Sequence, residues 1–212
     1  MKYTAIDIET YENIDLIPLL PAIEPDSRLK DEAKIQADIE KKRQEQISKM
    51  ALNPLWGKIA CIGYYNDEYA FCDIDDEKSM LETFLDYINK NSDSVLVTYN
   101  GLGFDLPFIA KRIVINKMGN IDCLKRYTEK NSCFHKDIMF EWCGWGKFEK
   151  LNNIATVFYG EQKEDFDVRQ ISELLKTEQG CKELEKYNLK DCELTYRLGK
   201  DILGLLTVDK KL

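Results

Sequence analysis

The hydrophobic segment from Ser94 to Tyr99 places the strongest constraint on how this chain can fold. It reads Ser-Val-Leu-Val-Thr-Tyr, a nearly continuous apolar run that is typical of a strand buried on both faces. Such a strand belongs in a sheet that is covered on both sides. Of the 212 residues, 44% are hydrophobic, enough for one sizeable core, so we expect a single domain over residues 1–212.

The hydrophobic patterns on either side of this segment predict the order of the remaining elements. Further strands are predicted at 3–9, 57–66, 69–74 and 135–140. Helices are predicted at 26–50, 77–91, 105–117, 151–159 and 180–206. The first three strands can pair as an antiparallel meander, and the later ones alternate with helices. We therefore expect a three-layer α/β domain with a mixed central sheet, in which the second strand is antiparallel.

The segment 26–50 is highly charged and contains neither Gly nor Pro. Its isoleucines and Met50 form only a thin apolar stripe, which predicts a helix with one narrow packing face. We expect a charged helical insertion that packs on the rim of the domain. Its polar face fits either a solvated surface or a role in substrate binding, and the sequence leaves both open.

Charge and cysteine content limit the possible functions. The net charge of −8 argues against a protein that grips duplex nucleic acid by bulk electrostatics, but not against an enzyme that meets phosphates through bound divalent cations. The seven cysteines form no Cys-x-x-Cys pair and predict free thiols in a reducing compartment. A strand predicted directly after Met1 and the lack of an apolar run of ~18 residues lead us to expect a soluble cytoplasmic protein without a signal peptide.

Two acids on the first predicted strand, Asp7 and Glu9, form the first candidate site motif. Side chains two residues apart on a strand point to the same face, so these carboxylates should stand side by side while Ile6 and Ile8 face a core. Two carboxylates at this spacing repel each other unless a cation or a proton lies between them. Taken alone, the pair is also typical of an exposed acidic strand end.

A second motif, Asn100-Gly101-Leu102-Gly103-Phe104-Asp105, follows the buried strand and opens the helix predicted at 105–117. Its glycines permit a tight strand-to-helix turn and a close approach of the backbone to a ligand. Asp105 falls at the start of the helix, where an acid is also favoured as a cap. Capping and catalysis therefore both explain Asp105.

A third motif, Tyr187-Asn188-Leu189-Lys190-Asp191, lies inside the last predicted helix. Residues four apart lie on one face of a helix, so Tyr187 and Asp191 can aim at a common point. An exposed polar helix face would produce the same pattern, and the motif by itself is weak.

Together the three motifs resemble those of the DEDD 3′–5′ exonucleases of the ribonuclease-H-like superfamily. Asp7-Ile8-Glu9-Thr10 is similar to the first motif of that group, and the segments 100–105 and 187–191 are similar to its second and third. One branch carries a histidine five residues before the last Asp, but that position here is Lys186, and the only histidine is His135. The tyrosine branch (DEDDy) is therefore the match, and the chain looks most like a free-standing relative of the exonuclease domains of family-B DNA polymerases.

The resemblance implies a ribonuclease-H-like fold and a two-metal hydrolysis of phosphodiester bonds, with Mg²⁺ or Mn²⁺ as the ions. It implies that Asp7 bridges both ions, that Glu9 and Asp191 complete the site of one, and that Asp105 supports the other. Tyr187 would orient the attacking water. A phenol with a pKa near 10 is a poor general base at neutral pH, so we assign Tyr187 to positioning more than to proton removal.

Substrate contacts are expected from three further residues of these motifs. Phe104 could stack on a terminal base or pack under the helix start, and Asn100 could bind the sugar-phosphate backbone or cap its own turn. Thr10 completes the first motif and is a third candidate contact. The most basic neighbourhood is expected to be solvated surface or, less favoured, part of a strand path; it comprises Lys111, Arg112, Lys117, Lys125 and Arg126.

The implied activity is the removal of nucleoside 5′-monophosphates from 3′ ends of single-stranded DNA. The same chemistry on RNA is a close alternative, because nothing in the sequence recognisably reads a 2′-hydroxyl. A non-catalytic nucleic-acid-binding or protein-binding module is disfavoured, since such a module need not keep four acids and Tyr187, five groups that repel one another or require a metal. A replication or repair protein is a possible partner, and no membrane is expected.

Overall fold

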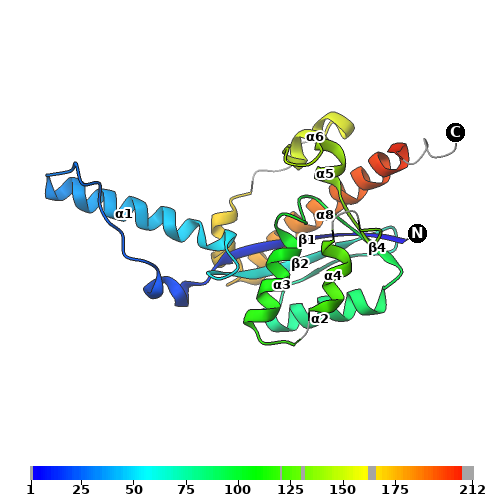
Figure 1. Cartoon of the computed structure of the whole chain (residues 1–212), viewed down its shortest axis with the longest axis horizontal. Coiled ribbons are helices and arrows are strands. Elements are labelled where there is room, and N and C mark those ends of the chain that lie inside the picture. Colours follow the sequence, from blue (N-terminus) through cyan, green and yellow to red (C-terminus); the bar gives the residue numbers. More distant parts are fainter. Residues whose placement is uncertain (1, 120, 130–131, 162–165, 207–212) are drawn as a thin grey trace.

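The computed structural model describes residues 2–119, 121–129, 132–161 and 166–206, and it contains one five-stranded sheet (Figure 1). The strands are β1 (Lys2–Glu12), β2 (Gly57–Tyr65), β3 (Ala70–Asp73), β4 (Ser94–Thr98) and β5 (His135–Asp137), in the order β3-β2-β1-β4-β5. β2 is antiparallel to β1 and β3, whereas β1, β4 and β5 run parallel. The prediction of a mixed sheet with an antiparallel second strand is confirmed.

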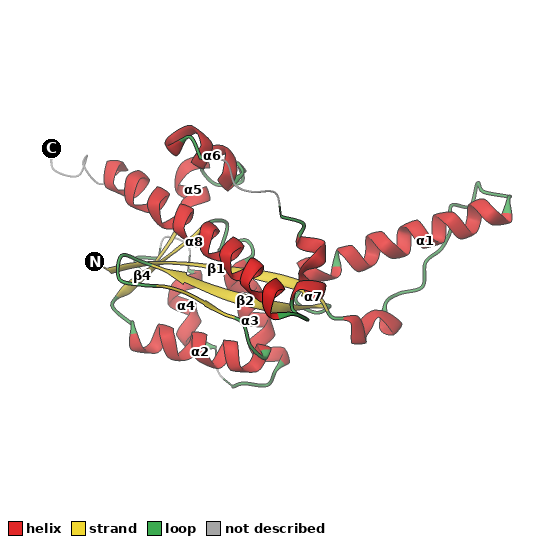
Figure 2. Cartoon of the chain, turned by 180° about the vertical axis from the view of Figure 1, so that it is seen from behind, coloured by secondary structure: helices red, strands yellow, loops and turns green. Residues whose placement is uncertain are grey.

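Helices cover both faces of this sheet (Figure 2). One face carries α2 (Glu77–Lys90), α3 (Asp105–Ile115) and α4 (Asp122–Thr128); the long helix α8 (Glu178–Leu206) crosses the other. Beside α8 lie α5 (Ile138–Cys143), α6 (Leu151–Tyr159) and α7 (Ile171–Leu174). Three 3₁₀ helices are η1 (Ile14–Leu19), η2 (Met50–Leu52) and η3 (Val168–Gln170). The three-layer α/β architecture is confirmed.

The alternation of side chains along β1 separates core from site. Ile6 and Ile8 point into the main core under α2 and α3, as predicted, and Ala5 packs on the α8 side. Asp7 and Glu9 therefore share the face covered by α8. The register between β1 and β2 shifts between Glu9 and Thr10, a β-bulge next to the acids.

Strand β4, between β1 and β5, is buried at all five residues, as its hydrophobic run predicted. Its Val95 and Leu96 are 3% and 1% exposed. Burying side chains of this size contributes about 1.5–3 kcal/mol each, so β4 is a principal part of the core. The segment that follows β4 leads directly into α3, which is where Asp105 lies.

Some elements differ from the prediction. β1 continues past Glu9 to Glu12, because β2 keeps pairing with it as far as Gly57, so the acids lie within the strand and not at its end. The strand predicted at 135–140 ends at Asp137, whose side chain accepts the Met139 N–H and starts α5 instead. The short helices α4 and α7 were not predicted, because they are too short for a clear hydrophobic period.

Residues 13–53 form an arm whose helical part projects from the body of the domain (Figures 1 and 2), while its last segment, η2, packs on β1 and β2. Its helix α1 (Glu32–Ser48) starts after Asp31, which accepts the Lys34 N–H, and none of its residues is buried. Hydrogen bonds to the preceding segment hold it, from Lys42 Nζ to Glu24 O (3.1 Å) and from Asp26 N to Asp38 Oδ2 (2.9 Å). The helix was predicted correctly, but the prediction that it packs on the rim of the domain was wrong. A stripe this thin offers too little apolar surface for the helix to pack against the domain.

One of the basic residues expected at the surface is buried. Arg112 is 4% exposed and forms a two-pronged ion pair with Glu77, through Nε to Oε1 (2.8 Å) and Nη2 to Oε2 (2.6 Å). Its Nη1 also donates to Pro54 O (2.9 Å), directly after the arm. Arg112 thus joins α2, α3 and the base of the arm, and for this residue the expectation of a solvated surface was wrong.

The seven cysteines are free thiols. Among the described helices, none combines the length and the apolar character needed to cross a membrane.

Candidate active site

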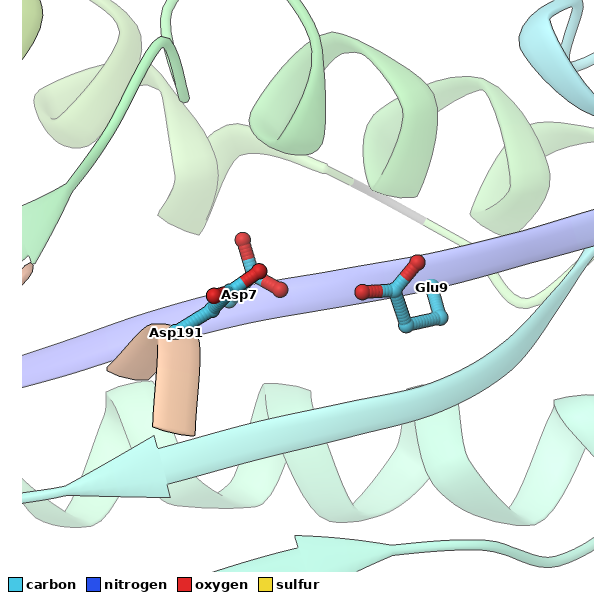
Figure 3. Close-up of side chains that lie close together, drawn as sticks. All are labelled: Asp7, Glu9 and Asp191. Carbon is cyan, nitrogen blue, oxygen red and sulfur yellow. The ribbon is translucent and has the colours of Figure 1, made fainter. Parts of the chain in front are cut away.

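Three predicted site residues meet at one point. Asp7 and Glu9 project from β1 and Asp191 from α8, and each places a carboxylate oxygen within 4.8 Å of the other two (Figure 3). Asp191 is 8% exposed, and the other two are half-buried. We call this group the carboxylate cluster. Residues from the two ends of the chain converge because α8 lies across the strand that carries the first two.

The donor set of the cluster suits a hard divalent cation. Three carboxylates this close repel one another strongly unless positive charge lies between them. Carboxylate oxygens are preferred ligands of Mg²⁺ and Mn²⁺, whereas thiols are not, and the cluster found among the described residues consists of carboxylates alone. Asp7, Glu9 and Asp191 are therefore the residues of the described chain that would hold such an ion.

Asn188, one turn before Asp191, orients Asp7. Its Nδ2 donates to Asp7 Oδ2 at 2.9 Å, and its own side chain is completely buried. Cys72 Sγ lies 3.5 Å from Asn188 Oδ1 and completes the contact behind it. Gly63, which pairs with Asp7 in the sheet, lets α8 approach β2 this closely because it has no side chain. A Cβ at this position would lie 1.9 Å from Asn188 Oδ1.

Sequence reasoning missed Asn188, although it stands inside the third motif. Its position on the inward face of the helix could have indicated its role, because a buried amide side chain needs a hydrogen-bond partner.

Asp105 lies at the start of α3, as predicted, and is 4% exposed. Its Oδ1 accepts the backbone N–H of Ile8 at 3.1 Å, which places its carboxyl beside the β1 backbone at the residue between Asp7 and Glu9. Asp105 is not a member of the carboxylate cluster, whose oxygens lie within 4.8 Å of one another. Burial raises the pKa of Asp105 from 3.8 to about 7, with smaller contributions from the charges of Asp137 and Asp191.

We expect Asp105→Asn to stabilise the metal-free protein at high pH. Well below pH 3.8 the carboxyl is neutral in both the folded and the unfolded chain, so its ionisation does not distinguish wild type from variant there. As the pH rises towards 7, only the unfolded chain ionises freely, and wild type loses up to about 4 kcal/mol that the variant keeps. Urea unfolding in EDTA at pH 4, 6 and 8 measures the free energy of unfolding of both proteins. If the difference between variant and wild type is no larger at pH 8 than at pH 4, the prediction is wrong.

Asp137 holds the second motif in place and was not predicted. Its carboxylate accepts the N–H groups of Asn100 and Leu102, both at 2.9 Å, while it also starts α5. Asn100 adopts a left-handed backbone conformation with φ 66°, which is one reason this turn needs external support. Burial raises the pKa of Asp137 above its usual value, although four backbone N–H groups oppose the shift.

Tyr187 lies beside the cluster, one turn before Asp191 on α8. Burial, followed by the charges of the three clustered carboxylates, raises its pKa well above 10. The Phe166 ring stacks on the Tyr187 ring, with centroids 4.0 Å apart and planes inclined by 19°. Tyr187 is therefore a neutral, sterically held phenol that can donate a hydrogen bond but does not readily release its proton.

The three predicted substrate contacts differ in how they are engaged. Thr10 is 7% exposed and donates its hydroxyl to Ala51 O at 2.7 Å. Phe104 is half-buried against Phe108, with ring centroids 5.4 Å apart, yet it also lines a cleft that reaches Glu9. Asn100 forms the turn described above. Contact of these residues with a substrate stays a prediction.

Fold and site together define a class of protein. A mixed sheet with one antiparallel strand, helices on both faces and acids on the central strand is a ribonuclease-H-like α/β domain. The family B DNA polymerase from the hyperthermophilic archaeon Pyrobaculum calidifontis has a similar fold, with a TM-score of 0.65 and 16% identity. The similarity covers 97% of this chain and 25% of that one.

Sequence comparisons identify the family. The model of the DNA polymerase family B exonuclease domain matches residues 36–159, more than half of the chain, and this chain belongs to that family. The match includes the second motif, whereas the first and third lie outside it. Membership implies 3′–5′ exonuclease activity.

Individual relatives are longer proteins. The DNA polymerase of Pyrococcus glycovorans is 26% identical over 148 residues, which cover 62% of this chain and 19% of that polymerase. The DNA polymerase of Thermococcus aggregans is 26% identical over 179 residues, covering 70% and 10%. The chain thus spans a fifth or less of these polymerases.

Proposed function

We propose that residues 1–212 act as one exonuclease domain that uses two divalent ions, Mg²⁺ or Mn²⁺, to remove nucleotides from 3′ ends of single-stranded DNA. The observation that carries the proposal is the convergence of Asp7, Glu9 and Asp191 within 4.8 Å, in a chain of this family. When bound, the ions would supply the nucleophile at neutral pH and stabilise charge on the attacking and leaving oxygens.

Each residue then has a distinct task. Asp7, oriented by Asn188, would be the ligand shared by both ions, and Glu9 and Asp191 would complete the site of one. Asp105, whose carboxyl is bound to the β1 backbone at Ile8, would support the other. Tyr187 donates a hydrogen bond that orients the attacking water, a role that suits a phenol whose pKa is raised.

DNA is the favoured polymer because the relatives are DNA polymerases, and single strands are favoured because the net charge of −8 opposes binding of a duplex by bulk attraction. The free cysteines fit a reducing compartment, and we propose the cytoplasm. A replication or repair protein would deliver the substrate.

The proposal predicts the products directly. Purified protein incubated with 5′-labelled single-stranded DNA and Mg²⁺ or Mn²⁺ should produce a ladder that shortens by one nucleotide at a time, with nucleoside 5′-monophosphates released. A matched RNA strand should be shortened more slowly. If neither polymer is shortened with either ion, the catalytic assignment fails; if RNA is the better substrate, the exoribonuclease alternative replaces it.

A further inference from the structure

A cleft of about 670 Å³ opens beside the carboxylate cluster and extends to the arm. Glu9 belongs to both the cluster and the cleft wall. One side of the cleft is formed by the last turns of α1 and the other by β1, the start of α3 and the segment 168–169. The lining includes Lys41, Glu45, Leu52, Phe104 and Arg169.

The floor of the cleft suits bases more than phosphates. Phe104 and the exposed Leu52 offer apolar surface in the same cleft as Glu9, and stacking of a base on an aromatic ring is independent of sequence. The other acid on the β1 side, Glu12, accepts a hydrogen bond from Ser172 Oγ at 2.7 Å.

The part of the arm nearest the site is basic, although the chain as a whole is acidic. Residues 41–49 contain Lys41, Lys42, Arg43 and Lys49 but only one acid, Glu45. Of these cations, Lys41 lines the cleft and has a side chain that is 77% exposed. Its Nζ lies 4.0 Å from Glu45 Oε1, so Glu45 offsets part of its charge.

We infer that the arm is a strand-binding element: the cleft between α1 and β1 holds the nucleotides adjacent to the 3′ end, with their bases on the floor and Lys41 on a backbone phosphate. The inference rests on the proposed function, because it requires the 3′ end of the strand to lie at the carboxylate cluster and the preceding nucleotides to extend from there into the cleft. It explains why a helix without buried residues lies beside a nuclease-type site. Glu45 limits the affinity, so that the strand can be released and advanced after each cut.

Binding of 5′-fluorescein-labelled dT12, measured by fluorescence anisotropy in EDTA, tests the inference without cleavage. Lys41→Glu should raise the dissociation constant about three- to tenfold, and Glu45→Lys should lower it by a similar factor. The slope of log affinity against log salt should fall by about 0.7 in Lys41→Glu, the value for one phosphate contact of a single strand.

Lys34→Glu is the matched control. Lys34 lies seven residues earlier, on the same face of α1 and ~10 Å further out along the arm, and it does not line the cleft. Its dissociation constant should stay within about twofold of wild type. If all three variants bind alike, or if wild type does not bind dT12, the arm is not a strand-binding element. If the wild-type protein still shortens DNA in the cleavage assay, only the strand-binding inference fails, and the proposed exonuclease function stands.

Discussion

Asp7→Asn is expected to lower the rate of 3′-end hydrolysis by at least about a thousandfold. The substitution keeps the size of the side chain and an oxygen that can accept the Asn188 Nδ2–H, so the fold should be unchanged. It removes one of three clustered negative charges at the position predicted to be shared by both ions. Loss of several kcal/mol of transition-state stabilisation corresponds to this factor in rate.

The measurement is the initial rate on 5′-labelled single-stranded DNA, together with calorimetric titration of Mn²⁺. Asp86→Asn, an exposed acid of α2 that pairs with Lys90, is the matched control and should match wild type in both. Tyr187→Phe should lose activity only in part and bind Mn²⁺ normally, because it keeps every carboxylate. Full activity in Asp7→Asn would remove the cluster from the mechanism.

Arg112→Met is expected to destabilise the protein by about 3–5 kcal/mol, the cost of leaving a buried carboxylate without its partner. Glu77 is 9% exposed, and besides Arg112 it accepts the Ile59 N–H at 2.8 Å and the Asn116 Nδ2–H at 3.0 Å. Those two neutral donors cannot balance its charge. The variant should also loosen the base of the arm, because the bond to Pro54 O is lost.

The double variant Arg112→Met/Glu77→Gln separates charge from packing. The substituted amide keeps an acceptor for the Ile59 N–H without a charge, so the double variant should be more stable than Arg112→Met alone. Lys90→Met, which breaks the exposed pair with Asp86, should cost less than ~1 kcal/mol. Urea unfolding measures all three; a loss in Arg112→Met no larger than in Lys90→Met would show that the buried pair contributes little.

The strand and helix pattern and the acids of the candidate site were predictable because both follow short-range rules. Alternation on β1 placed Asp7 and Glu9 on one face, and the four-residue helical repeat placed Tyr187 beside Asp191. The hydrophobic run of β4 revealed the covered sheet. Each of these signals lies within a few residues of sequence, where backbone geometry alone decides the direction of a side chain.

The partners of polar groups were not predictable in the same way. Arg112 has the sequence context of a surface residue, and only the packing of α3 on α2 buries it against Glu77. Asn188 and Asp137 look ordinary in the sequence, yet they orient Asp7 and the second motif. Hydrogen bonds between elements depend on how those elements are placed, which no local pattern encodes.

The sequence by itself determined the layered α/β class, the face of β1 that carries the acids and the charged helix of the arm. The tertiary structure alone decided that Asp7, Glu9 and Asp191 meet within 4.8 Å, that the Asp105 carboxyl accepts the Ile8 N–H of β1, and that α1 projects beside a cleft. The physical reason is range: periodicity and propensity act along one element, whereas charge repulsion, burial and cleft shape arise only where elements distant in sequence come together.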